Sequence, residues 1–298
     1  MVCQKELLIE KVSEIYEKIA SLENLSPSKP VNSLFTQLVL VCIPQCDLDI
    51  DKLSPRVQDI RSKLIKLCGK AEGLLESHFS TLIGSYENSL DHIRAFPYYS
   101  NYVKLSELEF SMLYDICVQV PKRVAFVGSG PLPLTSIILA TNHLKTTNFH
   151  NYDIDPSANS KALHLISSYS DLSKRMFFHT ADIMHVSASL KEYEVVFLAA
   201  LVGMNKEEKL QVINHLAEHM ATGALLLLRS AHDARAFLYP VIDPNDLRGF
   251  EVLSVFHPTD EIINSVIIAR KTRRPIHLPD QGLGSTLSSY KCSLIFKA

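Results

Sequence analysis

Residues 124–135 read Val-Ala-Phe-Val-Gly-Ser-Gly-Pro-Leu-Pro-Leu-Thr, and this stretch decides the fold of the chain. Its apolar start predicts a short buried strand, which runs through a Gly-Ser-Gly turn into the beginning of a helix. A second apolar segment follows about twenty residues later and ends in Tyr-Asp-Ile-Asp-Pro at 152–156. A strand, a glycine turn, a helix and an acidic strand end are together typical of a doubly wound α/β fold that holds a nucleoside.

The glycine turn predicts a nucleoside that carries no phosphate group. The Gly-x-Gly-x-x-Gly pattern of dinucleotide sites is incomplete, and Pro131 removes a backbone donor that a pyrophosphate would need. S-adenosylmethionine (SAM) fits this pattern, with Asp153 at its ribose and Asp182, after the third strand, at its adenine amino group. We expect Ala199, after the fourth strand, to lie next to the reacting carbon. The residues expected around the centre of the ligand are Gly128, Ser129, Gly130, Leu132 and Thr135.

Each of these features also has a simpler interpretation. A Gly-Ser-Gly after a strand is more often an ordinary turn than a ligand loop. An acid at a strand end is often a helix N-cap, and we expect this role for Asp155, which precedes Pro156. The order and joint spacing of the features favour the SAM site.

The composition describes a globular chain with a balanced charge. Of 298 residues, 47% are hydrophobic and 21% charged, and the net charge of −2 gives no general attraction to nucleic acid. The six cysteines form no CxxC pair, and the histidines show no metal-ligand spacing. The first residues carry no apolar signal segment, and no apolar run reaches the length of a membrane span. We therefore expect free thiols, no metal, no membrane span and a cytoplasmic location.

The chain changes character near Pro121. Apolar residues at helical spacing predict an all-helical domain of roughly five helices over 1–120. From 121 to 270 strands alternate with helices, which predicts a mostly parallel, Rossmann-like, SAM-binding domain. The predicted strands cover 123–127, 149–153, 176–179, 194–199, 224–228, 250–257 and 262–269, and the predicted helices between them cover 132–143, 157–168 and 206–220.

The end of the chain departs from this alternation. The last two predicted strands lie close together, which predicts an antiparallel pair at the end of the sheet, as in SAM-dependent transferases. The segment 271–298 is rich in Pro, Gly and Ser, and we expect it to be loosely ordered.

Three stretches carry a resemblance to a known family. They are Leu-Ile-Gly-Ser-Tyr-Glu-Asn at 82–88, Phe-Pro-Tyr-Tyr-Ser-Asn-Tyr at 96–102 and the glycine turn at 128–135. With them the chain resembles nicotianamine synthases, in particular the plant enzymes, from residue 25 to residue 270. The resemblance implies an enzyme that condenses three SAM molecules. Each gives its aminobutyrate part and releases methylthioadenosine, one unit closes to an azetidine ring, and the product is the metal chelator nicotianamine. It implies no cofactor beyond SAM, which is the substrate and the small-molecule partner.

Aminobutyrate transfer requires a base, because the attacking α-amine is mostly protonated near neutral pH. Our candidate is Glu76, which shares a helix face with Glu72 and has Leu75 and Phe79 as apolar neighbours. The resemblance assigns the acid/base pair to Glu76 and Tyr102. Glu87 is the rival base, and the sequence leaves the choice between the two glutamates open.

Each substrate also brings an α-carboxylate, which calls for a fixed cation. Arg229 and Arg235 follow the fifth strand, and arginine suits bidentate binding of a carboxylate. Tyr239 lies one helical turn after Arg235 and joins them as a candidate substrate contact.

Two other functional classes remain open from sequence. One is a SAM-dependent methyltransferase with a helical N-terminal domain, which would release adenosylhomocysteine instead of methylthioadenosine. The other is a non-catalytic binding protein with the same fold, against which the intact set of glycines and acids argues. The sequence gives no oligomeric state.

Overall fold

A computed structural model describes residues 4–273 and forms a seven-stranded sheet in the order β3-β2-β1-β4-β5-β7-β6. Strands β1 to β5 run parallel, and β7 runs antiparallel to both β5 and β6. The predicted fold class, a mostly parallel doubly wound sheet with an antiparallel pair at its end, is confirmed. The strands are β1 (Arg123–Val127), β2 (Asn148–Asp153), β3 (Met176–Thr180), β4 (Val195–Leu198), β5 (Leu225–Ser230), β6 (Phe250–Phe256) and β7 (Ser265–Lys271).

The bounds of the last strand differ from the expectation. β7 begins three residues later than predicted and continues to Lys271, where it pairs with Phe250 of β6. The loosely ordered tail predicted from 271 therefore begins inside a strand. Its remaining part from 274 onward lies outside the described residues.

The helices cover most of the segments in which they were predicted. Residues 55–84 form one uninterrupted helix of 30 residues, which begins with Pro55 in its first turn, where a missing N–H costs nothing. A short helix at 170–175 was not predicted. No helix between residues 4 and 273 is long and apolar enough to cross a membrane. The helices are α1 (Gln4–Ala20), α2 (Lys29–Cys42), α3 (Pro55–Gly84), α4 (Tyr99–Ile116), α5 (Leu134–Ile138, continued by a π-turn at Leu139–His143), α6 (Pro156–Ile166), α7 (Ser170–Arg175) and α8 (Lys206–His219).

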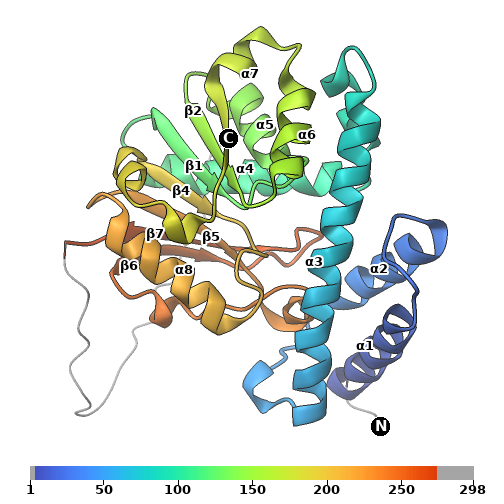
Figure 1. Ribbon diagram of the computed structural model, residues 1–298. Coiled ribbons are helices and arrows are strands. Elements are labelled where there is room, and N and C mark those ends of the chain that lie inside the picture. Colours follow the sequence, from blue (N-terminus) through green and yellow to red (C-terminus); the bar gives the residue numbers. More distant parts are fainter. Residues whose placement is uncertain (1–3, 274–298) are drawn as a thin grey trace, which may run out of the picture.

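Alternation along the strands gives the sheet two apolar faces. Phe126 and Phe197 point to one face, where α4 and α5 pack, and Val127 and Leu198 point to the other, where α8 packs. Since successive side chains of a strand point to opposite sides, these continuous apolar strands are buried on both faces. The result is a sheet between two helical layers, and Figure 1 shows α3 between this sandwich and the α1–α2 pair.

The helical region and the sheet region share their cores. The core under α1, α2 and α3 includes Ala234, Phe237 and Leu238 from the second half of the chain, and α4 packs into the sheet core. At the same junction the Asp233 carboxylate accepts hydrogen bonds from the backbone N–H groups of residues 46–48. The domain boundary at residue 120 stays a prediction, while the shared cores fix α3 against the sheet.

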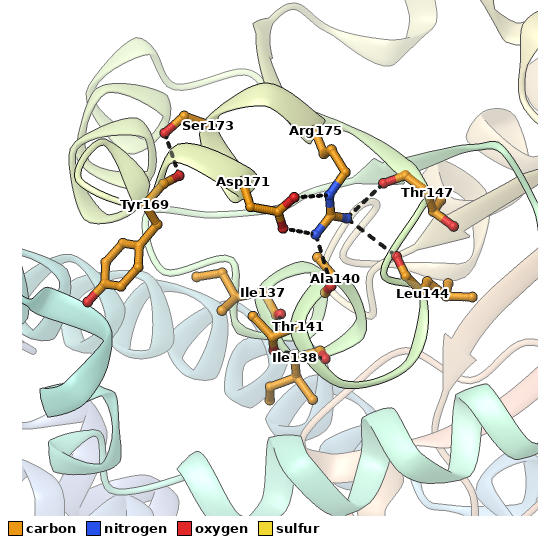
Figure 2. A network of polar contacts seen from close by, with 10 residues as sticks. All are labelled: Ile137, Ile138, Ala140, Thr141, Leu144, Thr147, Tyr169, Asp171, Ser173 and Arg175. Carbon is orange, nitrogen blue, oxygen red and sulfur yellow. Dashed lines mark hydrogen bonds and ion pairs between the residues drawn. The ribbon is translucent and has the colours of Figure 1, made fainter.

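Arg175, the last residue of α7, fixes the chain between α5 and β2. Its guanidinium donates to the backbone carbonyls of Ala140, Leu144 and Thr147, at 3.2, 3.4 and 3.1 Å, and pairs with Asp171 (Figure 2). These carbonyls belong to the π-turn and the loop after it, where regular helical hydrogen bonding ends. The side chain thereby holds the α5 end that follows the glycine turn.

Candidate active site

A cavity of about 780 Å³ lies beyond the carboxyl ends of the parallel strands, between the sheet and α3. This is the position at which doubly wound folds bind their ligands. The strand ends contribute the glycine turn after β1, Asp153 after β2, Asp182 after β3, Ala199 after β4 and Arg229 of β5. The helical region contributes Glu72, Glu76 and Tyr102, so the two halves of the chain enclose one chamber.

Two positions of the turn require glycine, because their φ angles are positive and because neighbouring side chains leave no room for a Cβ. Gly128 and Gly130 have φ angles of +80° and +68°. A Cβ on Gly128 would lie 2.3 Å from Val202 Cγ2, and one on Gly130 would lie 2.6 Å from Glu76 Oε2. The Glu76 carboxylate is therefore positioned directly over the glycine turn.

Asp153 lines the chamber and also holds the turn in place. Its Oδ2 accepts from the Gly130 N–H at 2.8 Å, and its Oδ1 accepts from the Asp155 N–H at 2.9 Å. Asp155 caps α6 by accepting from the Ser157 N–H, which confirms the N-cap prediction for that residue. The binding role of Asp153 stays a prediction.

The other predicted nucleoside contacts also line the chamber, with two of their side chains already engaged. Asp182 accepts from the Met184 N–H at 2.9 Å, and the Thr135 hydroxyl accepts from Arg229 at 2.7 Å. The Ser129 hydroxyl is buried with no hydrogen-bond partner among residues 4–273. Leu132 and Ala199 complete the set, and their ligand contacts likewise stay predictions.

Glu72, Glu76, Tyr102 and Tyr239 form one hydrogen-bonded group at the wall of the chamber. The Tyr102 hydroxyl lies 3.1 Å from Glu76 Oε1 and 3.3 Å from Glu72 Oε1. The Tyr239 hydroxyl donates to Glu72 Oε2 at 3.0 Å. The chain segments that carry these side chains are far apart in sequence and meet because α3 and α4 pack against the sheet.

Burial controls the protonation of this group. Desolvation raises the pKa of Glu76 well above its ordinary value, and the charges of Glu72 and Asp153 raise it further. Desolvation also raises the pKa of Glu72, against the lowering effect of the two tyrosine hydrogen bonds. The same burial, followed by the charges of Glu76 and Glu72, raises the pKa of Tyr102. Glu76 is thus a carboxylate that binds a proton unusually well.

The Arg229 guanidinium lines the chamber but is held from behind. Its Nε and Nη2 donate to the two oxygens of Glu109 at 2.7 and 2.9 Å, and Glu109 is fully buried. Burial by itself would lower the pKa of Arg229, but the Glu109 charge raises it above its ordinary value. Within the described chain Nη1 has no hydrogen-bond partner, so one edge of the guanidinium remains for a ligand.

Arg235 does not reach the chamber, which corrects its prediction as a substrate contact. It lies in a 3-10 turn at Asp233–Phe237, is 2% exposed, and donates through Nη2 to the Asp260 carbonyl at 2.6 Å. Its neighbours in the turn pack into the core under α1–α3, which carries the side chain away from the ligand space. Glu87, the rival base, is exposed and does not line the chamber, whereas Glu76 does.

Two buried residues near the site were missed from sequence. Glu109 has no local signal, because its partner Arg229 is 120 positions away. Lys209 is 0% exposed and donates through Nζ to the carbonyls of Ala199 and Ala200, behind the chamber wall at 199–204. Burial, and then the Arg229 charge, lower the pKa of Lys209 to about 7. A lysine on the apolar face of a predicted helix was the available signal.

A second cavity of about 340 Å³ adjoins the chamber. The two share Glu72, Tyr102, Tyr239 and Asn264 in their walls, so the carboxylate–tyrosine group lies between them. Among residues 4–273 no cluster of three or more His, Cys, Asp or Glu side chains could hold a metal ion. The described cysteines, at positions 42, 46, 68 and 117, are free thiols.

Comparison with known proteins finds similar sequences and a similar fold in one family. The family model described as nicotianamine synthase protein matches residues 2–276. A nicotianamine synthase of Solanum lycopersicum is 61% identical over 98% of this chain and 93% of its own length. Nicotianamine synthase 3 of Arabidopsis thaliana is 61% identical over 91% of this chain and 86% of its own length. The crystal structure of MtNAS in complex with MTA and tNA shares the fold, with a TM-score of 0.74 at 19% identity over 88% of this chain and 97% of that one. The chain belongs to the nicotianamine synthase family.

Proposed function

We propose that the chamber makes nicotianamine from SAM, with Glu76 as the general base and Tyr102 as its hydroxyl partner. The chain is an enzyme of this family, and its relatives carry that activity in their names. The observation that carries the residue assignment is the position of the Glu76 carboxylate, buried over Gly130 and hydrogen-bonded to Tyr102. Among the residues described, Glu72 and Glu76 are the glutamates that line the chamber. Both oxygens of Glu72 have hydrogen-bond partners, whereas Oε2 of Glu76 has none in the described part of the chain.

The reaction at this site is a displacement at carbon. The α-ammonium of the acceptor gives a proton to Glu76, and the free amine forms a bond to the γ-carbon of a donor SAM. The bond between that carbon and the sulfonium breaks, and its electron pair stays on sulfur as neutral methylthioadenosine. Because the sulfonium is a good leaving group, deprotonation and positioning are what the protein has to supply.

The raised pKa of Glu76 suits this proton transfer. An α-ammonium has a pKa of about 8 in water, so an ordinary carboxylate is too weak a base to take its proton readily. Desolvation and the Glu72 charge raise the pKa of Glu76 toward that of the ammonium. The proton affinities of donor and acceptor are thereby brought closer together.

The remaining walls support binding of SAM as substrate. Asp153 and Asp182 are candidates for the ribose and adenine contacts, and the free edge of Arg229 is suited to an α-carboxylate. Tyr239 lines both cavities and is a further candidate contact for a substrate. We propose no cofactor besides SAM and no macromolecular partner, and the cytoplasmic location stays a prediction.

The test is incubation of the pure protein with SAM alone and identification of every product by mass. We expect methylthioadenosine and nicotianamine; adenosylhomocysteine would instead indicate a methyltransferase. Glu76→Gln should bind SAM and lose activity by about 10²–10⁴-fold, the usual contribution of a general base. Glu87→Gln is the matched control and should retain the rate. Normal turnover by Glu76→Gln would refute the base assignment.

A further inference from the structure

Glu72 is a buried carboxylate in the chamber wall to which the proposed mechanism gives no task. It lies one helical turn before Glu76 on α3 and borders both cavities, whereas Glu76 borders the larger one only. The two glutamates share a single hydroxyl, that of Tyr102, at 3.3 and 3.1 Å. Two neighbouring carboxylates that are removed from water repel each other, which is unfavourable. The presence of Glu72 beside Glu76 therefore calls for a functional explanation.

The hydrogen bonds distinguish the two carboxylates. Tyr102 has one hydroxyl proton and donates it to one glutamate at a time. Glu72 has a second donor, the Tyr239 hydroxyl at 3.0 Å, so both of its oxygens have partners. Glu76 Oε2 lies over Gly130, and within the described chain no group donates to it. Glu72 is therefore the anchored member of the pair, and Glu76 is the member with a free oxygen facing the ligand space.

We propose that Glu72 is a positioning residue for the reaction: it places a fixed negative charge beside Glu76 and offers the Tyr102 hydroxyl an alternative acceptor. This inference rests on the proposed role of Glu76 as base. When Glu76 is ionised, the Tyr102 hydroxyl donates to it. When Glu76 has taken the substrate proton, the hydroxyl turns to Glu72, and the neutral carboxyl no longer competes for it.

The fixed charge also has a defined electrostatic effect. The groups that bear on Glu76 are Glu72 of α3, Tyr102 of α4, Asp153 after β2 and Arg229 of β5. Glu72 and Asp153 favour the protonated form, while Tyr102 and Arg229 favour the ionised form. Removing the Glu72 charge leaves the other groups in place, so the proton affinity of Glu76 falls and the base becomes weaker.

The test is the pH dependence of kcat/KM in Glu72→Gln, which keeps the shape and removes the charge. We expect the acidic limb, where Glu76 gains its proton, to move to lower pH by about one unit. We also expect kcat to fall several-fold while KM changes by less than about threefold. Asp59→Asn, an exposed carboxylate on the same helix, is the matched control and should leave the profile unmoved.

A second variant guards against loss of folding. Tyr239→Phe keeps both carboxylates and removes the donor that screens the Glu72 charge. The charge then acts more strongly on Glu76 and competes harder for the Tyr102 hydroxyl, so the acidic limb should move in the opposite direction, to higher pH, by a smaller amount. An unmoved limb in folded Glu72→Gln overturns the inference, and so does an activity as low as that of Glu76→Gln, because Glu72 would then act as a base. Retained activity in Glu76→Gln would refute the proposed function instead, whatever Glu72→Gln does.

Discussion

Gly130→Ala is the sharpest perturbation of the chamber, because the added methyl group points at the proposed base. The new Cβ would lie 2.6 Å from Glu76 Oε2, where ordinary contact begins at 3.4 Å. The carboxylate must therefore move by about 0.8 Å away from residue 130. Displacements of about 1 Å in catalytic groups cost on the order of 10² in rate.

The same substitution also strains the backbone. An alanine at φ +68° costs about 1–2 kcal/mol relative to glycine, because its Cβ approaches the neighbouring carbonyl oxygen. We therefore expect Gly130→Ala to lose about 1–2 kcal/mol of unfolding free energy and about 100-fold in kcat. The two effects have separate causes and are measured separately, by urea denaturation and by methylthioadenosine release.

Gly223→Ala separates strain from displacement. Gly223 has φ +89°, and a Cβ there would meet no atom within 4 Å. It lies between α8 and β5, away from the chamber, so its substitution should cost similar stability and leave kcat unchanged. The reasoning is refuted if Gly130→Ala loses no more activity than Gly223→Ala at equal unfolding free energy.

Two further predictions concern the buried charges that support the site. Glu109→Gln leaves the buried Arg229 charge unpaired and should lower the unfolding free energy in urea by about 3–5 kcal/mol, while Glu107→Gln, exposed on the same helix, should change it little; equal effects would contradict the ion-pair argument. The buried Lys209 makes stability depend on pH. Its pKa is about 7 in the folded chain and has the ordinary value of 10.5 in the unfolded chain. Between these two pH values the unfolded chain binds more protons, so the unfolding free energy rises with pH. Urea titrations at pH 7 and pH 10 should show Lys209→Met lacking that rise, and an identical pH slope in wild type and variant would show that the lysine is not buried as described.

Much of the fold could be predicted from the sequence because the central strands β1, β4 and β5 are largely apolar and are bounded by turns. β1 has its predicted bounds, and the predicted turn follows it at Gly128 and Gly130, both of which have a positive φ angle. The start of α5 was placed at residue 132, but the helix begins at Leu134, because Pro133 has a ψ of 59° and is not helical. The short helix α7 was not predicted, because six residues are too few to show a helical periodicity of apolar side chains.

The site was predictable only where its chemistry is local. The glycine turn and Asp153 belong to one continuous motif, so their spacing identified them. The Arg229–Glu109 pair could not be found in this way, because it joins β5 to α4 across 120 positions. Arg235 was misplaced because the sequence spacing assumed a helix, whereas residues 233–237 form a 3-10 turn with a different period. In this turn Ala234 and Phe237 pack into the helical core, and Arg235 donates to the Asp260 carbonyl.

When ionised, the buried carboxylates of Glu72 and Glu76 destabilise the fold. The pKa values of Glu72 and Glu76 are raised on folding, so the stability they contribute is present at low pH and is lost as the pH rises through their folded pKa values. At the pH where Glu76 must act as a base, ionised carboxylates therefore oppose closure of α3 over the glycine turn. Apolar contacts elsewhere have to offset this, and α3 has them: Leu64 and Ile83 are fully buried in two different cores, on either side of the pair. A helix of 30 residues anchored at both ends can carry an unfavourable pair of charges in its middle, which is where this chain places them.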